Sequence, residues 1–322
     1  MGTVVALGGQ LGGAKLAEGL HRLRGRDLAV VVNTGDDYEY LGLHVAPDTD
    51  TMLYALAGLA DATKGWEPAG ETFACHAMLM RLRGPAQTPL GDRALALQLL
   101  RAEALRAERT PTEVTLELAQ RLGIEARVLP MSDDPVRTVL DTDSGAMSFQ
   151  DYFVDLKCEP EVRGFHYGGA AEARLSDPVL DALHAPDLEA VVLLPCNPYH
   201  TILPILAVQG MREALRKRGA PVIAVSPIIG GRALQGSAAK MMRELGREVS
   251  ARAVAMEYYK LIDGIMVDTA DEALVEGIRA SGFHAVAAPT FMRTAEDRLR
   301  LARATLEFAR AVRLRQEIEA DA

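Results

Sequence analysis

The stretch that decides the fold reads LAVVVNTGDD over residues 28–37 and leads to PDTDT at residues 47–51. Its apolar first half predicts a strand that is buried on both faces, as strands of parallel sheets are. Its polar second half lies just beyond the carboxyl end of that strand, where open α/β sheets bind their ligands. The whole stretch supplies the carboxylates of Asp36, Asp37, Asp48 and Asp50.

Carboxylates gathered in this way repel one another unless a cation or a proton lies between them. Ligands that offer only oxygen atoms suit Mg²⁺ or Ca²⁺. One interpretation is therefore a divalent metal site next to this strand. The other is that Asp36 and Asp37 cap a helix while Asp48 and Asp50 form a solvated turn. The residues alone leave both interpretations open.

A glycine-rich loop follows the first predicted strand, at residues 3–7. The loop and the helix after it begin GGQLGGAKL at residues 8–16, and the helical spacing of apolar residues continues to about Gly25. Backbone amides at the start of such a helix favour an anion. With the strand at 28–32 these elements form one βαβ unit, so the sheet is parallel and the crossover right-handed. The loop matches neither the dinucleotide fingerprint nor a Walker loop, so by itself it is a weak signal.

The remaining elements complete an α/β pattern. Helices are predicted at 52–59, 73–82, 94–108, 112–122 and 294–312, a hairpin at 136–140 and 146–149, and strands at 127–130, 190–194, 221–225 and 264–267. We predict a Rossmann-like, mostly parallel sheet with helices on both faces. Residues 1–60 and 185–322 form its nucleotide-binding core. Residues 61–184 form a mainly helical insertion with a small β-hairpin.

The composition limits the class of protein. A net charge of −9 argues against bulk binding of nucleic acid and against adhesion to an anionic membrane. The three cysteines have no paired spacing, so we expect neither a disulfide framework nor a zinc site. The chain shows no signal-peptide pattern and no apolar run long enough to span a bilayer. We therefore expect a cytoplasmic protein.

Several predicted strands end in loops rich in Gly, Pro, Asn, Asp or Ser. These loops begin at Gly8, Asn33, Met131, Pro195 and Ser226. Parallel strands point their carboxyl ends in one direction, so most of these loops should line one crevice. Amide donors, carboxylates and a lysine in one crevice are typical of a site for a nucleotide diphosphate with a divalent ion. The residues by themselves therefore predict a nucleotide-using α/β enzyme.

Six segments, in this order, give the chain a resemblance to one family. They read VNTGDD at 32–37, PDTDT at 47–51, LGDR at 90–93, LPMSDDP at 129–135, FQD at 149–151 and VSPIIG at 225–230. Over nearly the whole chain, this set resembles the 2-phospho-L-lactate transferase family of coenzyme F-420 biosynthesis. The resemblance implies that the terminal ribityl hydroxyl of the deazaflavin Fo attacks a phosphorus of a guanosine diphosphate ester. GMP would then leave, and the product would be coenzyme F-420-0 or an analogue.

The resemblance also implies the roles of individual residues. The expected contacts of Fo, to whose site the insertion at 61–184 contributes, are Asp50, Arg93, Met131 and Ser132, of which Asp50 is also the expected catalytic residue. The expected ligands of a Mg²⁺ cofactor are Asp36, Asp48 and Asp50. The expected contacts of the guanine nucleotide are Gly9, Gly12, Gly13, Lys15, Asn197, Gly230 and Lys240. The family also suggests a homodimer.

Two departures from the family pattern concern the nucleotide. The family loop usually reads Gly-Gly-x-Gly-Gly, whereas this chain carries one more residue between its glycine pairs. The usual Ser-Asn-Pro is replaced by a run that begins at Cys196. Both changes bear on the fit of the nucleotide, and neither removes a carboxylate.

Two other classes of protein are alternatives. One is a non-catalytic, nucleotide-sugar-binding regulator of the gluconeogenesis-factor type, which would lack the Arg93 loop and the segment 132–134 that this chain contains. The other is a generic Rossmann dehydrogenase, which the glycine spacing disfavours. The sequence leaves open which three-carbon acid the donor carries: 2-phospholactate, phosphoenolpyruvate or 3-phosphoglycerate.

Overall fold

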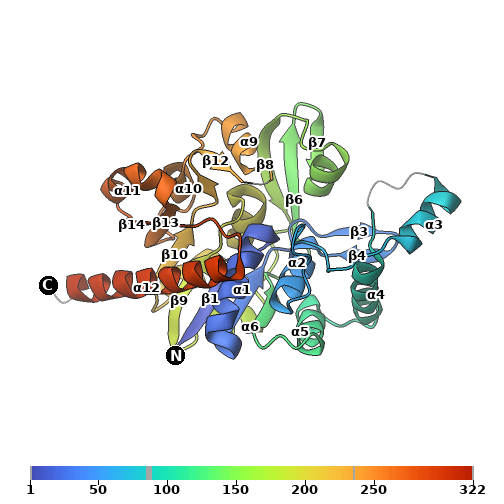
Figure 1. Cartoon of the computed structure of the whole chain (residues 1–322), viewed down its shortest axis with the longest axis horizontal. Coiled ribbons are helices and arrows are strands. Elements are labelled where there is room, and N and C mark those ends of the chain that lie inside the picture. The colour runs from blue at the N-terminus through green and yellow to red at the C-terminus, as the bar shows by residue number, and fades with distance from the viewer. Residues whose placement is uncertain (1, 85–88, 235, 321–322) are drawn as a thin grey trace.

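The centre of the fold is a parallel sheet, seen in a computed structural model that describes residues 2–84, 89–234 and 236–320 (Figure 1). Its seven strands lie in the order β14 (His284–Ala288), β13 (Gly264–Asp268), β10 (Val222–Val225), β9 (Leu188–Leu193), β1 (Thr3–Gly8), β2 (Leu28–Val32) and β5 (Arg127–Pro130). All neighbouring pairs are parallel. The predicted Rossmann-like α/β class is confirmed.

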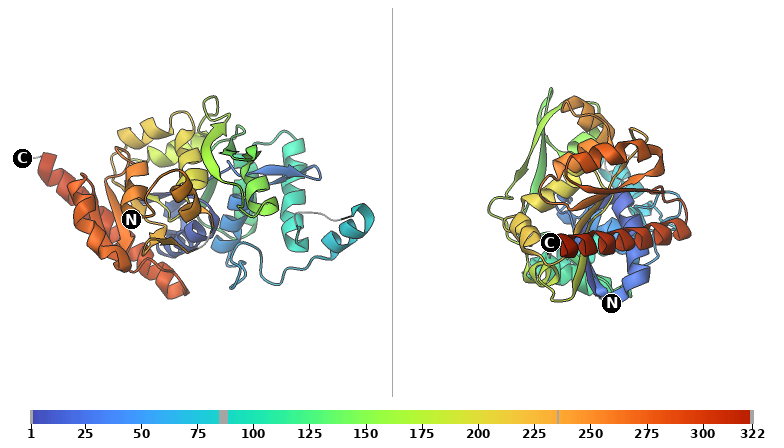
Figure 2. Two further views of the ribbon diagram at one scale, coloured as in Figure 1. Left: turned by 90° about the horizontal axis from the view of Figure 1, so that it is seen from above. Right: turned by 90° about the vertical axis from the view of Figure 1, so that its left-hand side faces the viewer.

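Helices cover both faces of this sheet. On one face, α1 (Gln10–Arg24) and α12 (Ala295–Ala320) pack against each other, and α12 contacts β9 and β10. On the other face, α6 (Asp177–Leu183) packs on β1 and β9 and contacts α8 (Met211–Lys217). Figure 2 shows α12 running along one side of the sheet. Because both faces are covered, every residue of β2 is fully buried, as its apolar run predicted.

One close contact joins the two helices of the first face. Gly19 of α1 faces the backbone of α12, and a Cβ atom at Gly19 would overlap the carbonyl oxygen of Arg298. Beside it, Glu18 forms ion pairs with Arg22 of its own helix and with Arg298 of α12. Glycine at this position therefore lets the two helix backbones approach closely.

The chain between β2 and β5 carries a hairpin and helices. β3 (Tyr38–Tyr40) and β4 (Leu43–Val45) pair antiparallel, and α2 (Pro47–Leu56), α3 (Ala74–Arg83), α4 (Asp92–Arg106) and α5 (Pro111–Arg121) follow. α2 begins at Pro47 and not near the predicted Met52, because proline in the first turn already has the φ of a helix. Asp48 and Asp50 thus lie in the first turn, where the helix dipole favours negative charge. Both are buried, so the solvated turn is the wrong interpretation.

A second sheet lies beyond β5. β6 (Arg137–Thr142) and β7 (Gly145–Ser148) form the predicted hairpin, and β8 (Val162–Gly168) adds an antiparallel strand that the sequence pattern did not predict. Within the range 61–184, which we expected to form an insertion, β5 is an edge strand of the central sheet. The smaller elements are α7 (Leu203–Ala207), α9 (Ala238–Glu244), α10 (Ala251–Glu257), α11 (Val275–Ala280), β11 (Ile228–Ile229), β12 (Arg232–Ala233), the π-helical turns Asp151–Asp155 and Pro198–Ile202, and the 3-10 turns Gly25–Asp27 and Thr269–Leu274.

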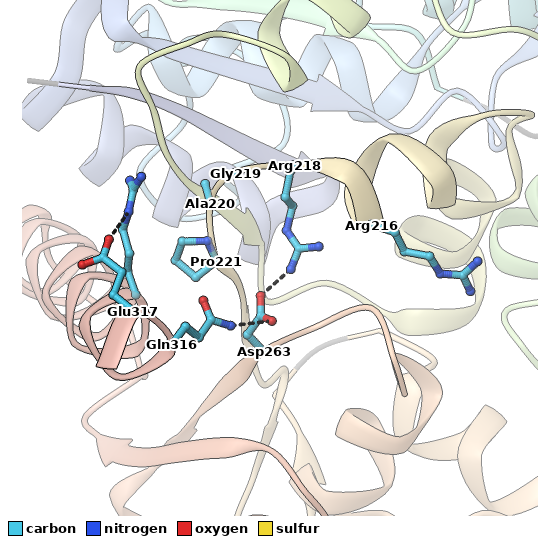
Figure 3. Close-up of a pocket in the computed structure, with 9 residues that line it drawn as sticks. Arg216, Arg218, Gly219, Ala220, Pro221, Asp263, Gln316 and Glu317 are labelled. Atoms are coloured by element: carbon cyan, nitrogen blue, oxygen red, sulfur yellow. Dashed lines mark hydrogen bonds and ion pairs between the residues drawn. The ribbon is translucent and has the colours of Figure 1, made fainter. Parts of the chain in front are cut away.

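The amino ends of β10 and β13 meet α12 at a small crevice of about 350 Å³ (Figure 3). Asp263 lines it and accepts hydrogen bonds from the Val222 backbone N–H at 2.7 Å and from the Gln316 side-chain amide at 2.9 Å. The Arg218 guanidinium forms an ion pair with the same carboxylate. These contacts fasten α12 to the amino edge of the sheet.

α3 stands apart from the sheet at one end of the molecule (Figures 1 and 2). Of its described residues 74–83, none is buried, and Met78 and Leu82 are 52% and 76% exposed. Leu99 and Leu100 on α4 are exposed as well. Across the described part of the chain, no helix combines the length and the apolar content that crossing a bilayer requires.

Candidate active site

A cavity of about 1090 Å³ opens at the carboxyl ends of the parallel strands. The segments that follow four strands line it, with Gln10 and Gly12 after β1, Asp36 after β2, Asn197 after β9 and Ser226 after β10. The predicted convergence of these loops on one crevice is confirmed for these strands. The loop after β5 contributes none of the described residues that line the cavity.

Asp48 lies in the cavity wall and is 5% exposed. Its carboxylate accepts hydrogen bonds from the Gln10 backbone N–H and from the Asn33 side-chain amide, both at 2.9 Å. A Cβ atom at Gly9 would overlap this carboxylate, so glycine lets the loop approach it. Burial, followed by the charge of Asp36, raises the pKa of Asp48 to about 8. Two carboxylates therefore repel each other in a buried wall of the cavity.

Asp36 pairs with a histidine to which the sequence pattern assigned no role. Nδ1 of His200 lies 2.9 Å from Oδ2 of Asp36, and both residues line the cavity. The Phe149 ring stacks on the His200 ring with 3.8 Å between their centroids. Oδ1 of Asp36 is buried and has no hydrogen-bond partner among the described residues. One oxygen of this carboxylate is thus held, and the other has no partner among the described residues.

Asp50 is engaged by an arginine. Both of its carboxylate oxygens accept hydrogen bonds from the Arg101 guanidinium, with 3.2 Å between Nη1 and Oδ2. Arg101 is only 4% exposed and also lies 3.5 Å from the carbonyl oxygen of His44. Asp50 therefore lines the cavity with its charge already balanced inside the protein.

The available donors decide whether a divalent cation fits. Among the described residues, no three His, Cys, Asp or Glu side chains come together as a ready-made metal site. Asp36 and Asp48 nevertheless offer two mutually repelling carboxylates, one of them with a buried oxygen that lacks a partner. Mg²⁺ in proteins is often held by one or two carboxylates while phosphate and water complete its shell. Asp36 and Asp48 fit that pattern, whereas Asp50 has Arg101 as its counterion.

The start of α1 and the loop after β9 bring part of the expected nucleotide site to the cavity wall. Gly12, Lys15 and Asn197 all line the cavity. Burial, followed by the charge of Arg298, lowers the pKa of Lys15. The Asn197 side chain accepts a hydrogen bond from the Tyr199 backbone N–H at 2.9 Å and so caps the π-helical turn Pro198–Ile202.

The glycine-rich loop at residues 8–13 packs against the side chain of Cys196. A Cβ atom at Gly13 would lie 2.6 Å from the sulfur of Cys196, and the thiol lies within hydrogen-bond distance of the Gly9 carbonyl, at 3.0 Å. Burial raises the pKa of Cys196 to about 12, so the thiol stays neutral and serves as a small packed side chain. The additional loop residue is accommodated by Gln10, whose φ of 52° lies in the left-handed region.

Four of the residues expected at the nucleotide are not among the described residues that line the cavity: Gly9, Gly13, Gly230 and Lys240. The backbone N–H of Gly230 donates to Asp271 at 2.9 Å. The ammonium group of Lys240 forms an ion pair with Glu244. Gly230 and Lys240 are thus each bound to a neighbouring residue of the protein.

Three residues expected at the Fo site also lie outside the described cavity lining. Arg93 is exposed and donates a hydrogen bond to the carbonyl oxygen of Ala69 at 2.5 Å. Met131 is fully buried in the core. The Ser132 hydroxyl donates to the carbonyl oxygen of Arg174 at 2.6 Å. Of the expected Fo contacts, Asp50 alone belongs to the described lining.

Fold and site together define a Rossmann-like α/β protein with an acidic ligand cavity at the carboxyl edge of its sheet. Within that class, residues 4–305 match the family model described as 2-phospho-L-lactate transferase CofD. The chain belongs to this family of transferases.

Named relatives match over most of their own length. The phosphoenolpyruvate transferase of Streptomyces griseus is 38% identical over 317 residues, which cover 96% of this chain and 99% of that protein. The 2-phospho-L-lactate transferase of Methanosarcina mazei is 37% identical over 300 residues, which cover 93% and 98%. A solved structure of a Bacillus halodurans protein matches with a TM-score of 0.62 at 16% identity and covers 95% of this chain and 99% of that chain. This structural likeness shows the fold alone.

Proposed function

We propose that this transferase moves a phospholactyl-type group from its guanosine diphosphate ester to the terminal ribityl hydroxyl of the deazaflavin Fo. The hydroxyl oxygen forms a bond to the phosphorus that carries the three-carbon acid, and the anhydride bond to GMP breaks. GMP takes the electron pair of that bond, the hydroxyl proton is released, and the product is coenzyme F-420-0 or an analogue. The observation that carries the proposal is the pair of carboxylates, Asp36 and Asp48, in a cavity at the carboxyl edge of the sheet.

The cofactor in this proposal is Mg²⁺, held by Asp36 and Asp48 with Asp50 beside them. The unpartnered Oδ1 of Asp36 and the raised pKa of Asp48 both support a cation at this place. A bound Mg²⁺ would neutralise charge on the diphosphate and make the attacking hydroxyl more acidic.

Asp50 is the proposed catalytic residue that positions the Fo hydroxyl. Arg101 supports this role because it fixes both oxygens of the Asp50 carboxylate and keeps its charge balanced. In the same proposal Arg93, Met131 and Ser132 shape the deazaflavin side. Arg93 and Ser132 donate to backbone carbonyls outside the cavity lining, so in this proposal they support that wall from behind.

The guanine nucleotide is proposed to bind at the glycine loop. Backbone amides near Gly12 and the ammonium group of Lys15 offer donors and one positive charge to the diphosphate. Asn197 supplies a side-chain amide on the facing wall. In this proposal Gly9 and Gly13 let the backbone come close, and Gly230 and Lys240 hold neighbouring loops.

The acid that the donor carries is a separate question. The relatives named phosphoenolpyruvate transferase and 2-phospho-L-lactate transferase differ little in their similarity to this chain, at 38–40% and 37% identity. Identity therefore does not choose between these acids, and 3-phosphoglycerate is the third candidate.

The direct test is to incubate the protein with Fo, Mg²⁺ and each of the three guanosine diphosphate esters in turn. We expect one ester to give GMP and a deazaflavin product whose mass is that of Fo plus the phosphorylated acid less one water. EDTA should stop the reaction. If none of the esters gave a deazaflavin product, the proposed function would be wrong.

We also propose that the protein forms a homodimer. The family resemblance supports this state, and so does α3, whose exposed Met78 and Leu82 lie one helical turn apart on one face. Exposed apolar side chains grouped on one element are typical of a surface that another chain covers.

A further inference from the structure

His200 occupies an unusual position for a histidine. It belongs to the π-helical turn Pro198–Ile202, lines the cavity, and is only 1% exposed. π-helical turns are rare and frequently lie at functional sites. Because Asn197 caps this turn, the loop after β9 delivers the imidazole to the same wall as Asp36.

The contacts of His200 identify which nitrogen carries the proton. Oδ2 of the Asp36 carboxylate accepts only, so Nδ1 of His200, 2.9 Å away, must be the donor. Nε2 then has a free lone pair, and the Gln10 side-chain amide nitrogen lies 3.2 Å from Nε2 and 3.3 Å from Nδ1. The stacked Phe149 ring prevents the imidazole from rotating away. The ring is thus fixed in both orientation and tautomer.

The same contacts form a closed network around the two carboxylates. The Asn33 amide donates to Asp48 at 2.9 Å and to the backbone carbonyl of His200 at 3.0 Å. Gln10 contacts Asp48 through its backbone and His200 through its side chain. His200 is the member that reaches Asp36. Each carboxylate is therefore oriented by the protein before any ligand binds.

We infer that His200 is a positioning residue for cation binding: it holds Oδ2 of Asp36 so that Oδ1 stays free for a divalent ion shared with Asp48. The inference rests on the metal site of the proposed function. Carboxylates that bind metal are themselves hydrogen-bonded, and losing such a partner typically weakens metal binding by about 10–100-fold. Without the Nδ1–H donor, the Asp36 side chain is free to turn away from Asp48.

Mn²⁺ is a suitable probe, because the electron paramagnetic resonance signal of the free ion disappears when it binds. The decisive variants are His200→Asn, whose amide can stand where Nδ1 stood, and His200→Gln, whose amide reaches the place of Nε2. Both keep a polar amide in the buried turn, so both are matched for folding. Tyr199→Phe is the control, because it removes a hydroxyl on the same turn that faces Glu257.

The Gln variant should bind Mn²⁺ about 10-fold or more weakly, while the Asn and Phe variants keep nearly the wild-type affinity. Equal affinity of the Asn and Gln variants would overturn the inference while leaving the metal site in place. A wild-type protein that bound no Mn²⁺ would instead remove the metal site and the inference with it. The ¹⁵N shifts of His200 in the unaltered chain give an independent check: the Nδ1–H tautomer is expected, and the Nε2–H tautomer would contradict the inference.

Discussion

At the scale of single residues, Asp50 and Arg101 form a buried ion pair in the cavity wall. Removing one member of such a pair leaves an unpaired buried charge, whereas replacing both members with apolar residues is often neutral for stability. The contribution of Asp50 to the fold can therefore be separated from its contribution to the chemistry.

We predict that Asp50→Asn lowers the free energy of unfolding by about 3–5 kcal/mol, because Arg101 loses its counterion. The same change should abolish Mg²⁺-dependent GMP release. The double variant Asp50→Leu with Arg101→Met should regain most of the stability and none of the release. Urea unfolding and the product assay on the same preparations measure both effects. A double variant that released GMP would contradict the catalytic role of Asp50.

Asp48 gives the protein a predicted dependence on pH. Its pKa is raised from 3.8 to about 8. Between these two pH values the Asp48 carboxyl is protonated in the folded protein and ionised in the unfolded chain. Ionisation of Asp48 should therefore lower the stability of the metal-free protein as the pH rises from about 4 to about 8. A cation favours the ionised carboxylate, so Mg²⁺ should raise the melting temperature more at about pH 8 than at about pH 6.

Calorimetric melting with and without Mg²⁺ checks this prediction, and Asp48→Asn is its control. The control should melt with less dependence on pH and should gain little from Mg²⁺. An equal gain at both pH values in the unaltered protein would show that Asp48 is not the group that the cation ionises.

The acidic residues of the site could be predicted from the sequence, but their partners could not. A buried strand followed by a polar loop was enough to bring Asp36 to a ligand crevice. His200 lies 164 positions from Asp36, and Arg101 lies 51 positions from Asp50. Residues so far apart in the sequence meet only because of how the helices and strands pack. The spacing of residues along the chain does not reveal that packing. The signal that was available for His200 was its place in the loop after the strand at 190–194.

At the scale of elements, the central sheet was predictable because strands buried on both faces are continuous apolar runs. β8 was not, because only Val162 of its stretch VRGFHYG is buried, so the strand has no continuous apolar run. The start of α2 was missed for a related reason. Its first turn carries acidic residues at the site, so the apolar periodicity begins only at Met52.

The contact between α1 and α12 yields a prediction about packing. Gly19→Ala should lower the free energy of unfolding by about 1–3 kcal/mol, because the new methyl group overlaps the Arg298 carbonyl. Gly277→Ala in α11 is the matched control, since no atom lies within 4 Å of the Cβ it would add. That change should stabilise the protein by about 0.5–1 kcal/mol. Chemical denaturation of both variants measures the difference, and equal effects would rule out close packing at Gly19.

At the scale of the whole molecule, α3 is a helix with no buried residue and with Met78 and Leu82 exposed. We predict that Leu82→Glu converts the proposed homodimer to a monomer, because a charge at that position cannot be buried by a second copy. Leu314→Glu is the control, since Leu314 is also exposed, at 58%, but lies on α12. Light scattering coupled to size-exclusion chromatography gives the mass of each variant. If both stayed dimeric, α3 would not form the interface.

The central claim is that two buried carboxylates hold a divalent cation at which an alcohol displaces GMP. The most direct measurement is the rate of GMP release from the active donor and Fo as Mg²⁺ is titrated, for the unaltered protein and for Asp48→Asn. The account predicts a saturable requirement for Mg²⁺ in the first and no release at any Mg²⁺ concentration in the second. GMP release by the unaltered protein at full rate in EDTA, or by Asp48→Asn at the unaltered rate, would contradict it.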